Sequence, residues 1–432
     1  MTDLKIHTLR ECNGCSEDSY KDNEPEILFK QDKEKKIGVY LKNKEDEKYL
    51  KTKADNYYVG IDWIEKGKSA VEIKPKLDKN GKNTDVLKMF FGCLKHPEVS
   101  AEVEKIYDIK FDEKPIIISK EQDQLTPLLV LQFLQVVKQI VKKGLKKGCH
   151  RKEENLNSRV KGKINVALNI KRNLHQPLYN YCSFEEFNED IKENRIIKKT
   201  LSFCQKYLSS YDSNFQKEYQ PLFDYCYPPF HNVSEKVNLF DLKFLKINSF
   251  YKEYRTAFQL ARLILKRYAY NLKNIEQGNK VSIPPHWIDM ALLFELYVLG
   301  MLKDTFNRSV TYQFEANKGN ILDYLLNTNG HKMVIDAKYK PSWKNKTNDE
   351  DIRQVSGYAR LNKVYEKLGK ACGENIDCLI IYPDVTDGVD IIIKKDFFKK
   401  NAVEEVKQYC GIYKLAVTLP QVESNEKIIF PL

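Results

Sequence analysis

The sequence has no long apolar run. None of its hydrophobic stretches approaches the roughly 20 residues that a membrane-spanning helix needs, and residues 1–7 contain no apolar signal-peptide core. Internal repeats and low-complexity tracts are also absent. The sequence therefore gives no sign of a membrane span, and we expect a cytoplasmic protein.

Cysteine is sparse, and its ten scattered positions do not have the spacing of a disulfide framework. We expect free thiols in a reducing compartment. Only Cys12 and Cys15 have the spacing of metal ligands, and their best partners in the sequence are Cys93 and His96. Such a Cys₃His set would suit zinc, but the gap between its halves is far longer than in common zinc modules. Zinc at Cys12 and Cys15 is left as an open alternative.

A phosphate-binding loop is also missing. The run Gly67-Lys68-Ser69 resembles the end of such a loop, but the glycine required five positions before Gly67 is Asp62. Gly60 lies two residues too early to replace it. A turn between two strands explains the run better, and we do not expect this chain to bind a nucleotide there.

The composition is that of a folded protein. With 432 residues, 42% hydrophobic and 12% aromatic, the chain is long enough for two or three domains with separate cores. Its formal net charge of +12 favours polyanionic partners. A moderate basic excess is a weak signal, because many basic proteins never contact nucleic acid.

Hydrophobic periodicity predicts an α+β protein in three parts. Residues 1–120 are rich in short β-prone runs, at 27–29, 37–41, 57–64 and 70–75. Residues 121–245 have a helical period that begins near Thr126-Pro127, so we expect a mainly helical middle domain. Residues 246–432 follow as a third domain with a mixed sheet flanked by helices.

A basic stretch lies in the middle part. It could contact phosphates, or it could be the solvated end of a helix, and the sequence does not separate the two. Its members are Lys138, Lys142, Lys143, Lys146, Lys147, Arg151, Lys152, Arg159, Lys161 and Lys163.

The third part has a regular order of predicted elements. The middle part is expected to contain a helix at 194–201. In the third part a helix is expected at 250–270, and Pro284-Pro285 is expected to start a helix over 287–306 that carries Glu295. Strands are expected near 309–316, 320–326 and 332–339, followed by a helix over 350–368 and a strand at 378–382.

Two carboxylates and an amine are predicted to meet on two of these strands. Because strand side chains alternate, Asp336 and Lys338 share a face, and the turn-forming run 327–330 folds Asp323 back beside Asp336. Mg²⁺ favours carboxylate and water oxygens, and a nearby ammonium can orient that water or offset phosphate charge. The pattern suggests phosphodiester hydrolysis. An exposed Asp/Lys pair with no such role is the competing interpretation.

The order helix, three strands, helix, strand, with Asp323 on the second strand and Asp336-Ala337-Lys338 on the third, resembles the core of the PD-(D/E)xK nucleases. Leu322 replaces the proline of that name, and Asp336 stands where Glu is more common. Both departures preserve the metal-ligand chemistry.

Within that superfamily the chain resembles the McrC family, the nuclease subunit of McrBC-type modification-dependent restriction systems. The resemblance covers roughly residues 125–385. It rests on the segments Val160-Lys161-Gly162-Lys163-Ile164, Phe187-Asn188-Glu189-Asp190, Asn194-Arg195-Ile196-Ile197-Lys198, Ile335 to Lys340 with Gln354 and Tyr358, and Leu379-Ile380-Ile381-Tyr382-Pro383.

The resemblance implies a Mg²⁺-dependent DNA endonuclease. Asp323, Asp336 and the Ala337 carbonyl would bind Mg²⁺, Lys338 would serve the attacking water, and Gln354 could position Lys338, water or a phosphate. Glu295 is a weaker candidate for a third metal ligand, and an exposed glutamate is its commoner explanation.

The resemblance also implies partners. McrC-like proteins act with McrB, an AAA+ GTPase that binds GTP and carries the reader of modified DNA, with 5-methylcytosine as the usual target. Residues 1–120 would enter that ring and stimulate GTP hydrolysis, double-stranded DNA would be the substrate, and nuclease domains could pair. A non-catalytic activator of the AAA+ partner and a stand-alone nuclease remain the alternatives.

Overall fold

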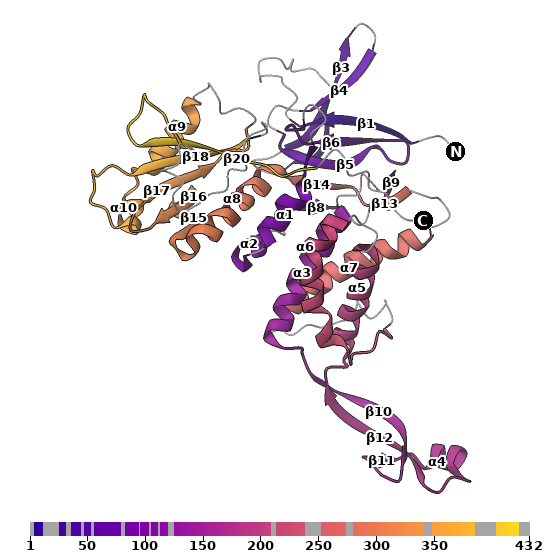
Figure 1. The fold of residues 1–432 in the computed structure, drawn as a ribbon. Coiled ribbons are helices and arrows are strands. Elements are labelled where there is room, and N and C mark those ends of the chain that lie inside the picture. The colour runs from indigo at the N-terminus through magenta and orange to yellow at the C-terminus, as the bar shows by residue number, and fades with distance from the viewer. Residues whose placement is uncertain are drawn as a thin grey trace. The chain divides into compact units, whose positions relative to one another are not determined.

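The computed structural model describes residues 4–11, 26–31, 36–44, 47–52, 56–78, 83–94, 96–102, 105–110, 113–119, 125–208, 213–237, 252–273, 280–340, 348–384 and 403–422. The chain forms two compact units, each containing both helices and strands. The first comprises Met1–Gln124 and Gly278–Lys427, and the second comprises Leu125–Gln277 and Ile428–Leu432. Figure 1 colours the elements in chain order.

The N-terminal part of the first unit is built on a five-stranded sheet with the order β1-β6-β5-β14-β8. Its strands are β1 (Lys5–Arg10), β5 (Tyr58–Glu65), β6 (Ser69–Lys74), β8 (Tyr107–Ile109) and β14 (His286–Asp289). The turn between β5 and β6 contains Gly67, whose φ of 86° suits glycine. The turn interpretation of Gly67-Lys68-Ser69 is therefore confirmed.

Smaller elements accompany this sheet. The four strands predicted from β-prone runs are confirmed as β2, β3, β5 and β6. The elements of this part that lie outside the five-stranded sheet are β2 (Glu26–Gln31), β3 (Lys36–Lys44), β4 (Glu47–Thr52), β7 (Asn83–Thr84), α1 (Val86–Leu94), α2 (Pro97–Glu102), β9 (Ile116–Ser119), β13 (Lys280–Ile283) and β21 (Gln421–Val422). Strands β2, β3 and β4 form a separate antiparallel sheet.

The helix expected over 287–306 begins later than predicted. Residues His286–Asp289 form strand β14, and helix α8 spans Met290–Phe306. Trp287 is fully buried and pairs with Gly60 on β5, so tertiary pairing outweighs the proline signal. Asp289 then caps the helix, because its side chain accepts hydrogen bonds from the amides of Ala291 and Leu292, both at 3.1 Å.

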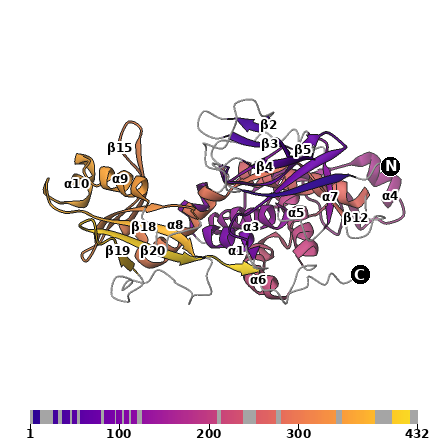
Figure 2. The same ribbon diagram turned by 90° about the horizontal axis from the view of Figure 1, so that it is seen from above.

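A mixed six-stranded sheet with the order β15-β16-β17-β18-β20-β19 forms the rest of the first unit. Its strands are β15 (Val310–Asn317), β16 (Asn320–Asn327), β17 (Lys332–Ala337), β18 (Asp377–Asp384), β19 (Val403–Glu405) and β20 (Ile412–Thr418). The predicted hairpin between β16 and β17 is confirmed by their antiparallel pairing, and β17 then pairs in parallel with β18. Figure 2 shows helices α9 and α10 beside these strands.

The single helix expected over 350–368 is two helices. They are α9 (Asp349–Tyr358) and α10 (Asn362–Leu368). At the break, Arg360 N donates to Gly357 O and Leu361 N donates to Tyr358 O, both at 3.2 Å, so tight turns replace the helical pattern. Both helices contribute to one apolar cluster with the sheet, through Val355 and Val364.

The second unit contains a helical bundle. Its helices are α3 (Leu125–Lys143), α5 (Lys192–Leu208), α6 (Ser213–Cys226) and α7 (Lys252–Lys273). Helix α7 packs against α3 and α5, so it belongs here and not to the third part expected to begin at residue 246. Helix α3 has the length and apolar composition of a membrane span, contrary to our expectation, but it is mostly buried and acts as a core helix.

A β-ribbon arm, which the sequence did not predict, also belongs to the second unit, although helices still make up most of its described elements. Strands β10 (Gly148–Asn157) and β12 (Tyr179–Asn188) pair along their whole lengths. The short strand β11 (Lys163–Ile164) and helix α4 (Val166–Asn173) complete the arm. Figure 1 shows it extending from the bundle helices. Its strands are charged and lack apolar alternation, which is why periodicity did not reveal them.

Candidate active site

Asp323 and Asp336 lie beside each other on adjacent strands. The regular pairing of β16 with β17 runs as far as Tyr324 opposite Ile335, and the two aspartates are the next residues along. The amide of Ala337 donates to Asp323 Oδ2 at 2.9 Å, which ties the two strands together at this point. Asp336 is only 2% exposed. The structure therefore brings the two predicted carboxylates together at the end of β17.

Lys338 completes this group. Its Nζ lies 2.8 Å from Asp336 Oδ2, and its amide donates to Ile381 O on β18 at 2.8 Å. Burial lowers the pKa of Lys338, but the charge and hydrogen bond of Asp336 and the charge of Asp323 outweigh that effect, and the net shift is upward. The two neighbouring carboxylates therefore favour the ammonium form of Lys338.

The two carboxyls hold their protons more tightly than usual. Burial raises the pKa of Asp323 well above 3.8, and the charges of Asp336 and Glu295 raise it further. Burial also raises the pKa of Asp336, against the lowering effect of Lys338. Like charges buried side by side are unfavourable unless a cation compensates them.

The donor set fits a hard divalent cation. Mg²⁺ is usually held by one or two carboxylates, with water and substrate phosphate filling its other positions. Asp323 and Asp336 supply the carboxylates, and the carbonyl of Ala337 lies between Asp336 and Lys338 in sequence. No group of three His, Cys, Asp or Glu side chains that could hold a metal occurs in the described part of the chain. The fit is therefore to a two-carboxylate site.

Glu295 is near this pair but is engaged elsewhere. It lies on α8, and its carboxylate accepts hydrogen bonds from the side chains of Tyr312 and Gln313. Burial raises its pKa, those hydrogen bonds lower it, and the charge of Asp336 raises it. Glu295 is thus within electrostatic reach of the pair, but the structure does not place it in a three-carboxylate cluster.

Gln354 is exposed on α9. Its amide donates to the hydroxyl of Tyr358, one turn further along, at 2.9 Å. This is an ordinary pair between neighbouring turns of a helix. The proposed role of Gln354 in positioning Lys338 or a phosphate therefore stays a prediction.

Sequence reasoning missed a buried carboxylate close to the site. Asp351, in the first turn of α9, is 3% exposed, and its Oδ1 lies 2.7 Å from Lys340 Nζ. Tyr382 on β18 donates its hydroxyl to Asp351 Oδ2 at 3.0 Å. No sequence pattern distinguishes Asp351, because acidic residues are common in the first turn of a helix, where they stabilise it.

On the opposite side of the strand end, Tyr339 is held by residues that follow β1 and β6. Its hydroxyl donates to Glu11 Oε1 at 2.7 Å, and its carbonyl accepts from Lys76 Nζ at 2.7 Å. Lys76 Nζ also lies 4.1 Å from the centre of the Tyr339 ring. Tyr339 follows Lys338 directly, so these contacts fix the backbone that carries the predicted catalytic lysine.

Glu11 makes this cluster sensitive to pH. Burial raises its pKa from 4.5 to about 7, Lys76 and the Tyr339 hydroxyl oppose the rise, and Asp289 adds to it. Its Oε2 has no hydrogen-bond partner among the described residues. The folded state therefore binds the proton of the Glu11 carboxyl more tightly than the unfolded state does. The stability that this protonated carboxyl contributes is lost as pH rises from 4.5 through 7.

We expect Glu11→Gln to remove that pH dependence. The rise from 4.5 to about 7 corresponds to about 3 kcal/mol. The stability of the variant relative to the wild type should therefore increase by about this amount between pH 4.5 and pH 8. Urea unfolding across that range measures it. A constant difference between the two proteins at all pH values would contradict the assignment, and Glu374→Gln, at an exposed residue, is the control.

Comparison with known proteins gives the family. The family model described as the McrBC 5-methylcytosine restriction system component matches residues 52–383. The chain belongs to this McrBC family.

Two solved structures from Thermococcus gammatolerans are similar to this chain. One is a refined half-complex from a tetradecameric assembly of McrB AAA+ hexamers with bound McrC, with 14% identity, coverage of 98% of this chain and 97% of that chain, and a TM-score of 0.41. The other is the McrBC complex, with 15% identity, coverage of 69% and 87%, and a TM-score of 0.27. No curated protein matches the chain.

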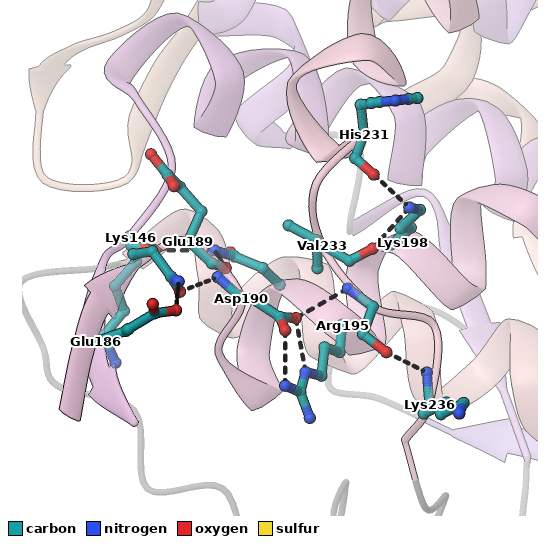
Figure 3. Close-up of polar contacts among 12 residues, drawn as sticks. Lys146, Glu186, Glu189, Asp190, Arg195, Lys198, His231, Val233 and Lys236 are labelled. Carbon is teal, nitrogen blue, oxygen red and sulfur yellow. Dashed lines mark hydrogen bonds and ion pairs between the residues drawn. The ribbon is translucent and has the colours of Figure 1, made fainter. Parts of the chain in front are cut away.

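Two segments that carried the resemblance to the McrBC family form the base of the arm, shown in Figure 3. Asn194, fully buried, donates to Lys146 O at 2.8 Å and to Glu189 O at 2.7 Å, so it ties together the ends of both long arm strands. Arg195 makes a two-pronged contact with Asp190 at 2.7 and 2.8 Å. These residues serve the arm's attachment to the bundle and do not form part of the carboxylate site.

A third such segment shapes the arm itself. Gly162 has a φ of 69°, and a Cβ there would lie 2.5 Å from Ser183 O, so only glycine fits. Lys161 Nζ lies 2.9 Å from Glu186 Oε1 and 4.2 Å from the centre of the Phe184 ring. This segment therefore holds the turn into β11 against β12.

The basic stretch is largely neutralised by acids. Lys146 pairs with Glu193 at 2.6 Å and Lys152 pairs with Glu154 at 3.0 Å. The stretch also leaves α3 and continues along β10, so it is not simply a solvated helix end. Phosphate contact by its unpaired members stays a prediction.

The zinc alternative lies partly outside the described residues, which exclude Cys12 and Cys15. Cys93 is fully buried and its thiol donates to Met89 O at 3.3 Å. Burial raises the pKa of this thiol, which disfavours the thiolate that a metal needs. His96 Nε2 lies 2.9 Å from Asp304 Oδ1. Each of these two residues thus has a structural partner.

Proposed function

We propose that this chain is the McrC-like subunit of a modification-dependent restriction system and cleaves DNA with Mg²⁺. It would act in the cytoplasm with an AAA+ GTPase like the McrB of the similar solved assemblies, and it would stimulate that partner's GTP hydrolysis. The family's 5-methylcytosine description suggests methylated DNA as the target, with the partner reading the base. Such a system would serve anti-phage defence.

The adjacency of Asp323 and Asp336, with Lys338 paired to Asp336, carries this proposal. The sheet order around the site supports a PD-(D/E)xK nuclease domain, because the two acids lie on an antiparallel pair and β17 continues in parallel to β18. A solvated surface pair would not explain an Asp336 that is 2% exposed.

The proposed chemistry is attack of water on a DNA phosphodiester. Mg²⁺, when bound, would polarise the phosphate and lower the pKa of a bound water. Asp323 and Asp336 would hold the cation, together with the Ala337 carbonyl. Lys338, as an ammonium, would orient the water and offset the negative charge that grows on the phosphate. Tyr339 and its partners would keep this strand end in place.

The partner requires a contact surface. The arm offers a candidate for it, in addition to residues 1–120. Side chains on one face of α4 and at its end are exposed: Val166 at 64%, Ile170 at 60% and Leu174 at 69%. Their spacing of four residues makes one apolar stripe. Phe187 on β12 is 68% exposed as well. A concentration of apolar groups on one small element marks a protein contact, and we assign it to the AAA+ partner.

The proposal predicts cleavage that requires Mg²⁺, the partner and GTP together. Methylated and unmethylated DNA would be incubated with the chain, each component being omitted in turn, and the products separated on gels. We expect cuts only in methylated DNA with all components present, and none when EDTA removes Mg²⁺.

Other outcomes identify the alternatives. Cleavage without the partner would establish a stand-alone nuclease. Stimulated GTP hydrolysis without any cleavage, on every DNA tested, would instead establish an architectural activator. Double-strand cuts that depend on the square of the protein concentration would indicate paired nuclease domains.

A further inference from the structure

A second lysine follows the predicted catalytic strand and is held by a buried acid. Lys340 lies two residues after Lys338, and its amide donates to Lys338 O at 2.8 Å, which turns the chain just past the site. Its side chain is 33% exposed, and its Nζ lies 2.7 Å from Asp351 Oδ1. Lys340 thus has an ammonium group that is fixed in position and still reaches solvent.

Asp351 is built into the protein as a support. Its side chain is 3% exposed, and both of its oxygens are engaged, Oδ1 by Lys340 and Oδ2 by the Tyr382 hydroxyl at 3.0 Å. Burying a carboxylate is costly unless it is paired and hydrogen-bonded. Asp351 is too enclosed to bind a substrate, so its role is exerted through Lys340.

This support comes from the elements that border the carboxylate pair. Tyr382 follows Ile381, which is the β18 partner of Ala337, and Asp351 is in the first turn of α9. Burial raises the pKa of the Asp336 carboxyl and Lys338 opposes that rise, while Asp351 raises it and Lys340 lowers it as smaller influences. The Lys340–Asp351 pair is therefore within electrostatic reach of Asp336.

We propose that Lys340 binds a backbone phosphate of the DNA strand beside the phosphodiester that is cut, and that Asp351 and Tyr382 are positioning residues for it. This inference rests on the proposed nuclease function. A lysine is a compact point charge that suits phosphate contact. The partial exposure of Lys340 leaves donor capacity for a phosphate oxygen, because an ammonium has three N–H groups.

A purely structural ion pair would behave differently. Such a pair would only hold the end of β17 against α9. Its loss would lower the stability of the fold without altering the response of DNA binding to salt. A phosphate contact instead releases counterions, so each one contributes roughly 0.9 to the slope of log K against log salt concentration. The salt slope therefore separates the two roles.

The test measures binding of a short methylated duplex and its cleavage by the complete complex with the AAA+ partner and GTP. We expect Lys340→Met to raise KM for DNA about tenfold, with a smaller change in kcat, and to reduce the salt slope by about one. Lys340→Arg should restore most of the affinity, because it keeps a charged donor at this position.

Asp351→Asn isolates the positioning role. Lys340 keeps its charge in this variant, so the salt slope should stay close to the wild-type value while kcat/KM falls severalfold. Because Lys340→Met leaves a buried carboxylate unpaired and can unfold the protein, the double variant Lys340→Met/Asp351→Asn is also needed. It removes both charges and should still show the reduced slope.

Lys332→Met is the matched control. Lys332 starts the same strand at its opposite end and donates to Gly369 O at 3.2 Å. Its loss should leave KM and the salt slope unchanged. A wild-type slope in both Lys340→Met and the double variant would overturn the inference, as would an equal effect of Lys332→Met. Binding is measured separately from cleavage, so a chain that binds through Lys340 but never cuts would refute only the nuclease proposal.

Discussion

Replacing Asp336 with asparagine should lower the rate of DNA cleavage by about 10³-fold or more, which corresponds to about 4 kcal/mol of transition-state stabilisation. The substitution keeps the size of this buried side chain but removes the charge that pairs with Lys338 and that would hold Mg²⁺. Lys338→Ala should have a comparable effect, because it removes the cation beside the reacting phosphate. Gel-based cleavage rates of the partner-bound protein with GTP provide the measurement.

Stimulation of the partner's GTP hydrolysis should survive in both variants, because neither residue is on the arm. That second readout shows that the protein is folded and assembled. Asp377→Asn is the matched control, since Asp377 begins β18 at the other end of the same sheet, opposite Met333. Wild-type cleavage by the Asp336→Asn protein would make the site assignment wrong, whatever happens to GTP hydrolysis.

The parts of the fold that the sequence predicted are those with strong local signals. The Asn327–Gly330 turn and the alternation that follows it predicted the β16–β17 hairpin and the meeting of Asp323 with Asp336. Such a hairpin is fixed by neighbouring residues, and its register follows from the turn. Strands β2, β3, β5 and β6 were also predicted from local signals, because each contains a short run of β-prone residues bounded by charged turns.

Long-range pairing explains what was missed. Because Trp287 comes shortly after Pro284-Pro285, the sequence predicted that a helix starts there. In the structure Trp287 lies in β14, which pairs with β5 on one side and β8 on the other. The choice depends on strands more than 170 residues away in the sequence, because Trp287 pairs with Asp108 on β8 and Gly60 on β5. Asp351 was missed similarly, because its neighbour Lys340 is distinguished only once α9 folds over the strand end.

The arm shows a third kind of failure. Strands β10 and β12 are joined by backbone pairing, by the Lys152–Glu186 ion pair and by Asn194 at their base, and their buried apolar residues form only the small cluster of Leu156, Cys182 and Phe184. A pattern search for buried residues cannot detect such a ribbon. Other apolar residues of the arm are exposed on α4 and at its end, and we propose that they form a surface for the partner.

The double variant Ile170→Ser/Leu174→Ser should therefore reduce stimulation of the partner's GTPase at least tenfold. Both side chains are more than half exposed, at 60% and 69%, so removing them should change the stability of the isolated chain by less than about 1 kcal/mol. Buried apolar anchors at an interface typically contribute more than that to binding. GTP hydrolysis by the partner, titrated with the variant, measures the loss.

Two single variants accompany this test, one as a control and one to identify which surface contacts the partner. Tyr225→Ser, at an exposed position of 46% on α6, is the control for loss of any surface apolar group and should behave as the wild type. Ile117→Ser, exposed by 43% on β9, tests residues 1–120. If Ile117→Ser abolishes stimulation and the α4 double variant does not, the partner surface lies in the N-terminal part. If the α4 variant alone fails, the arm is the element that engages the GTPase, and DNA cleavage should fail with it, since the proposed nuclease is active within that complex.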